Sequence, residues 1–262
     1  MSVEESFVLV DAIGAVATIT LNRPVQFNDL SSGMIAALQN ALTQVQSTGA
    51  VRVVVLAGAG RAFCAGHDLR EMQAHPDQDW LAALFAQCSR LMLTIAEMPQ
   101  PVIARVQGIA TAAGCQLVAA CDLAIAGQSA RFATSGVNLG LFCSTPAVAI
   151  TRSLAAKHAA ELLFSGDFID AECAERWGLI NRCVNDPDLE SVTQKWATAI
   201  ASKSGTALAS GKALLRRQRE LTTADAYAVA VQNMARDMQN EDACLGIRAF
   251  LDKQPTPDWT HR

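Results

Sequence analysis

Two runs of small residues in this chain could hold a polarised carbonyl oxygen. One is Thr111–Gln116, with the sequence Thr-Ala-Ala-Gly-Cys-Gln, and the other is Arg61–Leu69, with the sequence Arg-Ala-Phe-Cys-Ala-Gly-His-Asp-Leu. Each run follows an apolar segment typical of a strand and enters a segment expected to be helical. Small side chains leave backbone N–H groups uncovered, and a helix N-terminus adds partial positive charge. Two such loops side by side would stabilise an oxyanion between two N–H donors.

The segments that would position these loops alternate between strand and helix patterns. Val51–Ala57 is a β-branched run typical of a parallel strand buried on both faces, and it leads into the first loop. Val102–Val106 is the strand expected before the second loop, and Gly114–Ala120 is expected to form a short buried helix. This order favours parallel β-α-β units with right-handed crossovers.

Further elements are expected on both sides of this core. Phe7–Val10 and Val16–Leu21 predict a hairpin, and Ser31 or Ser32 could cap the helix that follows it. Trp80–Met98 has the apolar spacing of a long amphipathic helix. The polar residues 71–79 before it are expected to form a loose loop where a ligand could be covered. The sequence therefore predicts an α/β core over residues 1–195 and a helical C-terminal region over residues 196–262.

Composition and charge narrow the class of protein. The chain has 262 residues, 51% of them hydrophobic and 18% charged, and its formal net charge is −4. This balance argues against nucleic acid as the main partner. The basic residues are expected to form a solvated helix face, and they are Lys212, Arg216, Arg217 and Arg219. Polar residues interrupt the longest apolar window, Ile109–Ala126, which argues against a membrane span. The first six residues show no targeting pattern, so a cytoplasmic location is expected.

The eight cysteines are scattered without any Cys-x-x-Cys pair, and the four histidines are isolated. Most of the cysteines lie among apolar residues, which is typical of buried free thiols in a reducing compartment. We therefore expect no metal site.

Several motifs in the same order resemble the crotonase family, the enoyl-CoA hydratases (lyases) and isomerases associated with fatty acid metabolism. The motifs are Leu21–Pro24 with Asn28, Ala62–Leu69, Gly108–Leu117 with Cys121 and Asp122, and Gly246–Lys253. The resemblance implies an α/β crotonase (ClpP-like) fold of repeated β-β-α units with a helical C-terminal region. It also implies a homotrimer or homohexamer that binds an acyl-CoA thioester, with coenzyme A as part of the substrate and no further cofactor.

The resemblance assigns roles to particular residues. In the family, two backbone N–H groups bind the thioester oxygen, and the matching positions are His67 and Ala113. The remaining positions expected to contact substrate are Asp68, Leu69, Arg70, Gly136, Ser144 and Lys253. Lys253 is expected near the phosphates of coenzyme A.

The chain departs from the family pattern where hydratases carry two glutamates. Gln116 stands at the first of these positions and Gly136 at the second. An amide does not exchange protons near neutral pH, and glycine has no side chain. A third position, which some members fill with Asp, corresponds here to Cys143 and Ser144. This combination resembles the subgroup called enoyl-CoA hydratase domain-containing protein 3.

These substitutions leave three hypotheses open. The chain could act on a CoA thioester through enolate stabilisation with a non-standard acid–base set, bind acyl-CoA without catalysis, or retain weak hydratase activity with a water oriented by Gln116. Replacing both Gln116 and Gly136 with Glu is expected to raise hydration.

Individual side chains also have two interpretations. The His67 imidazole could act as an acid or base, or only its backbone could matter. Asp68 is interpreted as a helix cap rather than a base. Gln116 could orient a water or be a satisfied buried polar residue. Cys143, close to an expected helix start, is interpreted as core or pocket lining rather than a nucleophile.

Overall fold

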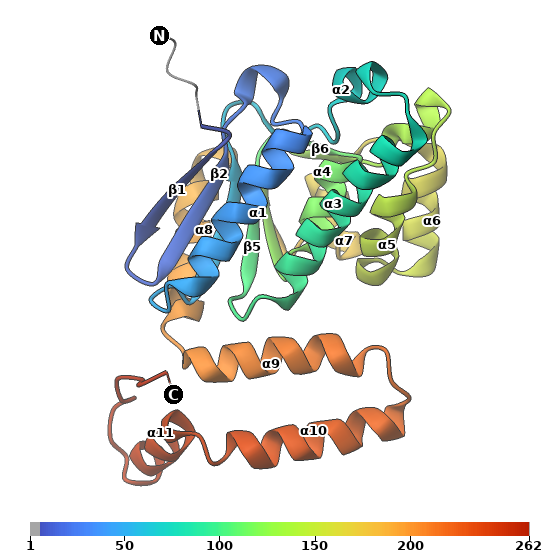
Figure 1. The fold of residues 1–262 in the computed structure, drawn as a ribbon. Coiled ribbons are helices and arrows are strands. Elements are labelled where there is room, and N and C mark those ends of the chain that lie inside the picture. The colour runs from blue at the N-terminus through green and yellow to red at the C-terminus, as the bar shows by residue number, and fades with distance from the viewer. Residues whose placement is uncertain (1–5, 262) are drawn as a thin grey trace.

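The computed structural model describes residues 6–261 and shows an α/β core followed by a helical C-terminal layer (Figure 1). The α/β class expected from the sequence is confirmed. The strands are β1 (Val8–Ile13), β2 (Val16–Leu21), β3 (Val53–Gly58), β4 (Ala62–Cys64), β5 (Val102–Val106), β6 (Ile109–Thr111), β7 (Leu123–Gly127), β8 (Arg131–Ala133), β9 (Ile169–Asp170) and β10 (Arg182–Val184). The α-helices are α1 (Ser32–Ser47), α2 (Leu69–Ala74), α3 (Gln78–Glu97), α4 (Ala113–Ala120), α5 (Ser144–Ser153), α6 (Ala156–Ser165), α7 (Ala171–Trp177), α8 (Leu189–Ala201), α9 (Gly205–Gln218), α10 (Thr223–Asp237) and α11 (Glu241–Leu251). Three short 3-10 helices are η1 (Pro24–Gln26), η2 (Ser135–Leu139) and η3 (Asp186–Asp188).

The strands form two sheets. The larger one has the order β1-β2-β3-β5-β7-β10, and the smaller one has the order β4-β6-β8-β9. β1 and β2 pair antiparallel as the predicted hairpin, whereas β2, β3, β5, β7 and β10 run parallel. In the smaller sheet β4, β6 and β8 are parallel, which brings the ends of β4 and β6 to the same edge.

β3 is buried on both faces, as its β-branched sequence predicts. Val54 and Leu56 face the main core with α1 and α3. Val53 and Val55 face the opposite side, where they pack against Ala197 of α8. This alternation follows from the two-residue period of a strand, and it explains why every position from Val53 to Ala57 is apolar.

α1 begins where its capping residue predicts. The Ser31 side chain accepts a hydrogen bond from the Met34 N–H at 3.2 Å, and Ser32 is the first helical residue. The apolar faces of α1 and α3 cover one face of the larger sheet (Figure 1). The cap and the apolar period therefore agree with the tertiary packing.

The stretch 71–79 is more ordered than the sequence predicts. Residues 69–74 form α2, and α3 starts at Gln78. Asp68 caps α2 and Asp77 caps α3, since each side chain accepts a backbone N–H from the helix that follows it. The prediction of a loose loop underestimated these two local caps.

The change from core to C-terminal layer follows α8. Ala197 and Ala201 pack against the larger sheet, and the boundary expected at residue 195 falls within this helix. α9, α10 and α11 then lie in a separate layer away from α1 and α2 (Figure 1).

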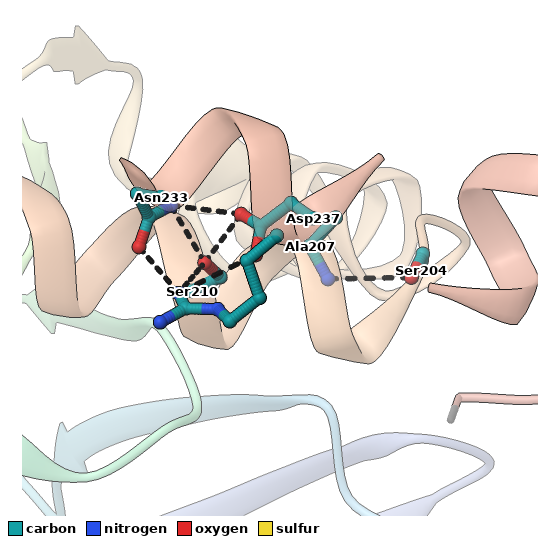
Figure 2. Close-up of polar contacts among 6 residues, drawn as sticks. Ser204, Ala207, Ser210, Asn233 and Asp237 are labelled. Atoms are coloured by element: carbon teal, nitrogen blue, oxygen red, sulfur yellow. Dashed lines mark hydrogen bonds and ion pairs between the residues drawn. The ribbon is translucent and has the colours of Figure 1, made fainter. Parts of the chain in front are cut away.

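A polar cluster joins α9 to α10 (Figure 2). The Asn233 amide donates hydrogen bonds to the Ser210 hydroxyl at 2.9 Å and to the Asp237 carboxylate at 2.8 Å. The Ser210 hydroxyl donates to the same carboxylate at 2.5 Å. Arg236 donates to the Asn233 side-chain oxygen and completes the cluster. These contacts fix the register of the two helices against each other.

Lys212 on α9 differs from the solvated face expected for it. Its ammonium lies 2.7 Å from the Asp122 carboxylate and donates to the carbonyl oxygens of Ile95 and Gln100. The Lys212 side chain is only 7% exposed. Burial lowers the pKa of Lys212, and the Asp122 carboxylate opposes that shift. The expectation of a solvated lysine was wrong because it considered one helix without the core beneath it.

The described cysteines form no disulfide bonds. All eight cysteines are free thiols, and Cys64, Cys88, Cys115 and Cys143 are buried. Within residues 6–261, no group of three His, Cys, Asp or Glu side chains is arranged to hold a metal ion. None of the helices in that range is long and apolar enough to cross a membrane.

Candidate functional site

The two small-residue loops meet at the shared edge of β4 and β6. Cys64 ends β4 and pairs with Ala110 of β6, so the segments that follow these strands leave side by side. A Cβ atom built on Gly66 would lie 3.0 Å from the Ala112 Cβ and 3.3 Å from the Ala113 nitrogen. Gly66 has a φ of +93°, so this close approach and its backbone conformation both favour glycine.

The backbone N–H groups of His67 and Ala113 point away from the neighbouring segments to which their peptide carbonyl groups are hydrogen-bonded. The Gly66 carbonyl oxygen accepts from the Leu30 N–H at 2.7 Å. Because C=O and N–H point in opposite directions in a trans peptide, the His67 N–H is directed away from Leu30. Likewise, the Ala112 carbonyl oxygen accepts from the Gln116 N–H at 3.0 Å, so the Ala113 N–H is directed out of α4. Neither N–H therefore points toward the backbone donor that its peptide's carbonyl oxygen accepts from.

The His67 imidazole is partly buried, and its pKa lies well below neutral pH. Burial lowers its pKa from 6.5 to about 4, and the nearby Glu71 carboxylate opposes this shift. The ring meets Phe85 edge-on with 5.3 Å between ring centroids. Its Nε2 atom is buried and lacks a hydrogen-bond partner within the described chain. The Nε2 atom can therefore take part in one further hydrogen bond. With a pKa of about 4, the imidazole is neutral at pH 7 and is not a cationic acid there.

Asp68, the residue after His67, is the N-cap of α2, and Leu69 and Arg70 are the first two residues of that helix. The Asp68 carboxylate accepts hydrogen bonds from the Arg70 N–H at 2.9 Å and the Glu71 N–H at 3.1 Å. This geometry agrees with the helix-cap interpretation of Asp68. Leu69 is 55% exposed and Arg70 is exposed, so both side chains reach solvent beside the two loops.

Gln116 lies one helical turn beyond Ala113 on α4. Its side chain is buried, with the residue 3% exposed, and its Oε1 atom has no partner among the described residues. A buried amide oxygen without a partner costs free energy, so this atom is an acceptor left for a ligand or water. The protein groups described do not themselves satisfy Oε1, so both interpretations of Gln116 stay predictions.

Gly136, in η2, has no room for a side chain. A Cβ atom there would lie 2.8 Å from the Cys143 sulfur and still closer to the Leu141 carbonyl oxygen. The Leu141 N–H donates to the Gly136 carbonyl oxygen at 2.9 Å, which holds this segment in place. The Thr111 and Ser135 hydroxyls, 2.9 Å apart, join η2 to the end of β6. Residues 141–143 thus fill the space that a glutamate side chain would enter.

Cys143 and Ser144 stand at the start of α5. Cys143 is the residue before the helix and is 7% exposed, and burial raises the pKa of its thiol. This agrees with its interpretation as lining rather than as an activated nucleophile. The Ser144 side chain is exposed, and its hydroxyl makes one long contact of 3.4 Å with the Phe142 carbonyl oxygen.

Lys253 is not brought to the other predicted residues within one chain. It follows α11, in the C-terminal layer, on the opposite side of the core from α2 and β6 (Figure 1). Its side chain is exposed. A role for Lys253 at the same site would therefore require a second copy of the chain.

Asp29 is a residue of this region that sequence reasoning missed. It precedes Leu30, which pairs with His67, and its Oδ1 atom is buried without a partner in the described part of the chain. Burial raises the pKa of Asp29 to about 6, and the neighbouring Asp68 carboxylate adds to this effect. No local pattern marks Asp29, because the charged residues that surround it include Asp68 and Glu71, which are distant in the sequence.

Comparisons with known proteins place the chain in a family. A model of the enoyl-CoA hydratase/isomerase family matches residues 11–262, and the chain belongs to this family, as its motifs predicted. Within the family it is similar to enoyl-CoA hydratase domain-containing protein 3 of Xenopus laevis, with 41% identity over 93% of this chain and 82% of the relative. The subgroup resemblance is thus confirmed.

Solved structures of enoyl-CoA hydratases and related proteins have the same fold as this chain. An enoyl-CoA hydratase from Mycobacterium smegmatis matches with a TM-score of 0.95 and 49% identity, over 97% of this chain and 99% of that one. Human enoyl-CoA hydratase domain-containing protein 3 matches with a TM-score of 0.93 and 38% identity, over 96% of this chain and 99% of the human chain. The crotonase fold is therefore confirmed.

One expectation is corrected by the same comparisons. The relatives of Xenopus laevis, mouse and human are named mitochondrial proteins. These names contradict the cytoplasmic location expected from the first residues of the chain. The expectation failed because the absence of a recognised local pattern is weak evidence about location.

Proposed function

We propose that this protein binds an acyl-CoA thioester with the carbonyl oxygen between the N–H groups of His67 and Ala113. The observation that carries the proposal is the contact of the two loops, with the Ala113 nitrogen 3.3 Å from the Cβ position of Gly66. Enolate-like charge on the thioester oxygen would be stabilised there. Each such donor typically contributes about 3–4 kcal/mol to transition-state stabilisation.

The chemistry proposed is enolate stabilisation without efficient hydration. Gln116 replaces the first family glutamate and Gly136 replaces the second. A general acid or base typically contributes about 10²–10⁴-fold to a rate, so losing both should leave hydration slow. No cofactor beyond the coenzyme A of the substrate is part of this proposal.

A second candidate function is non-catalytic binding of acyl-CoA. The observation that favours it is the packing of Leu141 and Cys143 against Gly136, which leaves no place for a second acid. A third candidate is weak hydratase activity, favoured by the unpartnered Oε1 of Gln116, which could accept a hydrogen bond from a water.

One experiment separates these candidates. The purified protein is mixed with crotonyl-CoA and a panel of acyl-CoAs, and enoyl absorbance, free thiol release and binding heat are followed. Binding with slow or no hydration is expected. Hydration within about tenfold of an ordinary family member would contradict the role given to the missing glutamates. The absence of binding to any acyl-CoA would contradict the ligand assignment.

The proposed assembly is a homotrimer or homohexamer formed through the C-terminal layer. Large apolar side chains are exposed on α10, at its C-terminal cap and on α11, and they are Tyr227, Val231, Met234, Met238, Ile247, Phe250 and Leu251. Covering this surface with a second copy would remove it from water. Such an arrangement would also let Lys253 of a neighbouring copy approach the phosphates of a bound CoA.

The assembly is tested by light scattering of the wild-type protein and of the variant Val231→Asp. The wild type is expected at three or six times the mass of one chain, and the variant at a lower mass. A monomeric wild type would contradict the proposed assembly without affecting the ligand assignment.

A further inference from the structure

Ala112, between the two donor segments, has an unusual backbone. Its φ is +51° and its ψ is −119°. This conformation corresponds to the first central position of a type II′ turn, where glycine is the usual residue. A non-glycine residue persists in such a conformation only when its surroundings impose it, and such residues cluster at functional sites.

The surroundings of Ala112 impose this conformation from both sides. Its N–H donates to the Ala133 carbonyl oxygen at 3.0 Å, which continues the pairing of β6 with β8. Its carbonyl oxygen accepts from the Gln116 N–H at 3.0 Å, which begins α4. The ψ angle of Ala112 sets the plane of the Ala112–Ala113 peptide. It therefore sets the direction of the Ala113 N–H.

The methyl group of Ala112 faces the other loop. A Cβ atom on Gly66 would lie only 3.0 Å from the Ala112 Cβ. The methyl group therefore fills the space between the start of α4 and the Gly66–His67 peptide. Removing it would let the two segments approach or shift, whereas a much larger side chain would separate them.

We propose that Ala112 is a positioning residue of the oxyanion site, which spaces the two donor segments and aims the Ala113 N–H. This inference rests on the proposed function, because it assumes that a thioester oxygen is bound there. The Ala112 side chain itself need not touch the reacting atoms. Its effect passes through the backbone of Ala113 and the position of His67.

The test compares an acyl-CoA thioester with its thioether analogue, in which the carbonyl group is replaced by CH₂. The ratio of the two dissociation constants measures the contribution of the bound carbonyl oxygen alone. In the wild type the thioester is expected to bind more tightly. In Ala112→Gly this preference is expected to fall by about tenfold, a partial loss of the contribution of one donor, while thioether binding stays unchanged.

Two controls separate positioning from stability. Glycine accepts a positive φ without strain, so the melting temperature of Ala112→Gly is expected to stay level or rise. Ala112→Ser keeps a Cβ atom and is expected to retain the thioester preference. As a spectroscopic signature, the absorbance of a bound aromatic enoyl-CoA is expected to shift to longer wavelength in the wild type and Ala112→Ser, and to shift less in Ala112→Gly.

The possible failures are distinguishable. An unchanged thioester preference in Ala112→Gly, or an equal loss of thioester and thioether binding, would overturn the positioning role while the proposed function stands. A wild-type protein that binds both analogues equally or neither would overturn the proposed function, and this inference with it.

Discussion

Gln116 has an amide where the family resemblance expects the carboxylate of a glutamate. Its side chain is buried on α4, and its Oε1 atom lacks a partner in the part of the chain described. Gly136, by contrast, faces the Leu141 carbonyl oxygen and the Cys143 sulfur with no intervening space. The two departures therefore differ in what a single substitution can restore.

Gln116→Glu is expected to raise the hydration of crotonyl-CoA by about tenfold or more, since it adds a group that can exchange a proton without changing side-chain length. The measurement is the loss of enoyl absorbance under saturating substrate. Gln116→Met, of similar length but without a proton-exchanging group, is the matched control and should stay at the wild-type rate. A Glu variant that binds crotonyl-CoA and hydrates it no faster would contradict the prediction.

Adding Gly136→Glu is expected to bring no further gain. The sequence alone predicted that the double variant would raise hydration. In the structure a side chain at residue 136 would have to displace the Leu141 carbonyl oxygen, which is backbone and moves only with the segment around it. The double variant should therefore be less stable than Gln116→Glu, as measured by its melting temperature, and no faster.

His67 is expected to make the stability of the protein fall in acid. Its pKa is about 4 when folded, compared with 6.5 for an unperturbed histidine. Between these values the unfolded chain binds a proton that the folded protein does not, so stability is full above pH 6.5 and declines as the pH falls toward 4. The total effect is roughly 3 kcal/mol.

The measurement compares urea unfolding of the wild type and of His67→Gln from pH 7 to pH 4. As the pH falls, the wild type should lose more unfolding free energy than His67→Gln does. Asp29, whose pKa is raised to about 6, acts in the opposite direction but is present in both proteins. A difference that stays constant across this range would contradict the burial of a neutral imidazole.

At the scale of the element, α4 depends on its close approach to β4. A Cβ atom on Gly114 would lie 2.8 Å from the Cys64 carbonyl carbon and 3.0 Å from the Cys64 Cβ, with the carbonyl oxygen nearer still. The helix can therefore present the Ala113 N–H beside His67 only because residue 114 has no side chain. The approach is a tertiary contact between backbones.

Gly114→Ala is expected to destabilise the protein by roughly 1–3 kcal/mol, the usual cost of overpacking a core. Gly211, in the middle of α9, has no atom within 4 Å of its Cβ position. Gly211→Ala should instead stabilise the protein by about 0.5–1 kcal/mol, because alanine favours the helix. Urea unfolding of the two variants checks both signs. Equal effects would contradict the backbone contact at α4.

At the scale of the whole molecule, an ion pair made by a buried lysine connects the C-terminal layer to the core. Lys212 of α9 reaches Asp122, which follows α4, and the carbonyl oxygens of Ile95 and Gln100. One turn further along α9, Arg216 pairs with Glu97 at 3.2 Å, but both side chains are 52% exposed. Both pairs join the C-terminal layer to the core, but the Lys212 side chain is buried and the Arg216 side chain is exposed.

Lys212→Met is expected to cost about 1–3 kcal/mol of unfolding free energy, because it leaves the Ile95 and Gln100 carbonyl oxygens and the Asp122 carboxylate without their donor. Arg216→Met should cost less than about 1 kcal/mol, as is usual for an exposed pair. Urea unfolding measures both values, and proteolysis between α8 and α9 reports on the docking of the layer. Equal costs for the two variants would contradict the structural role of Lys212.

The sequence by itself determined the features that depend on local pattern. The hairpin of β1 and β2, the burial of β3 on both faces and the Ser31 cap of α1 all follow from residue spacing. These features depend on dihedral preferences and on the periods of strand and helix, which act within a few residues. The sequence motifs also indicated the family, and the resemblance puts Gln116 and Gly136 at the positions of the family glutamates.

Only the tertiary structure decided what surrounds those residues. It placed Leu141 and Cys143 against Gly136, buried Lys212 against Asp122, and brought Gly66 close to Ala112. Each contact joins segments that pack through different elements, so no local period encodes it. Burial and desolvation depend on the whole set of neighbours, and it is these neighbours that determine whether a side chain is charged, accommodated or free to bind a ligand.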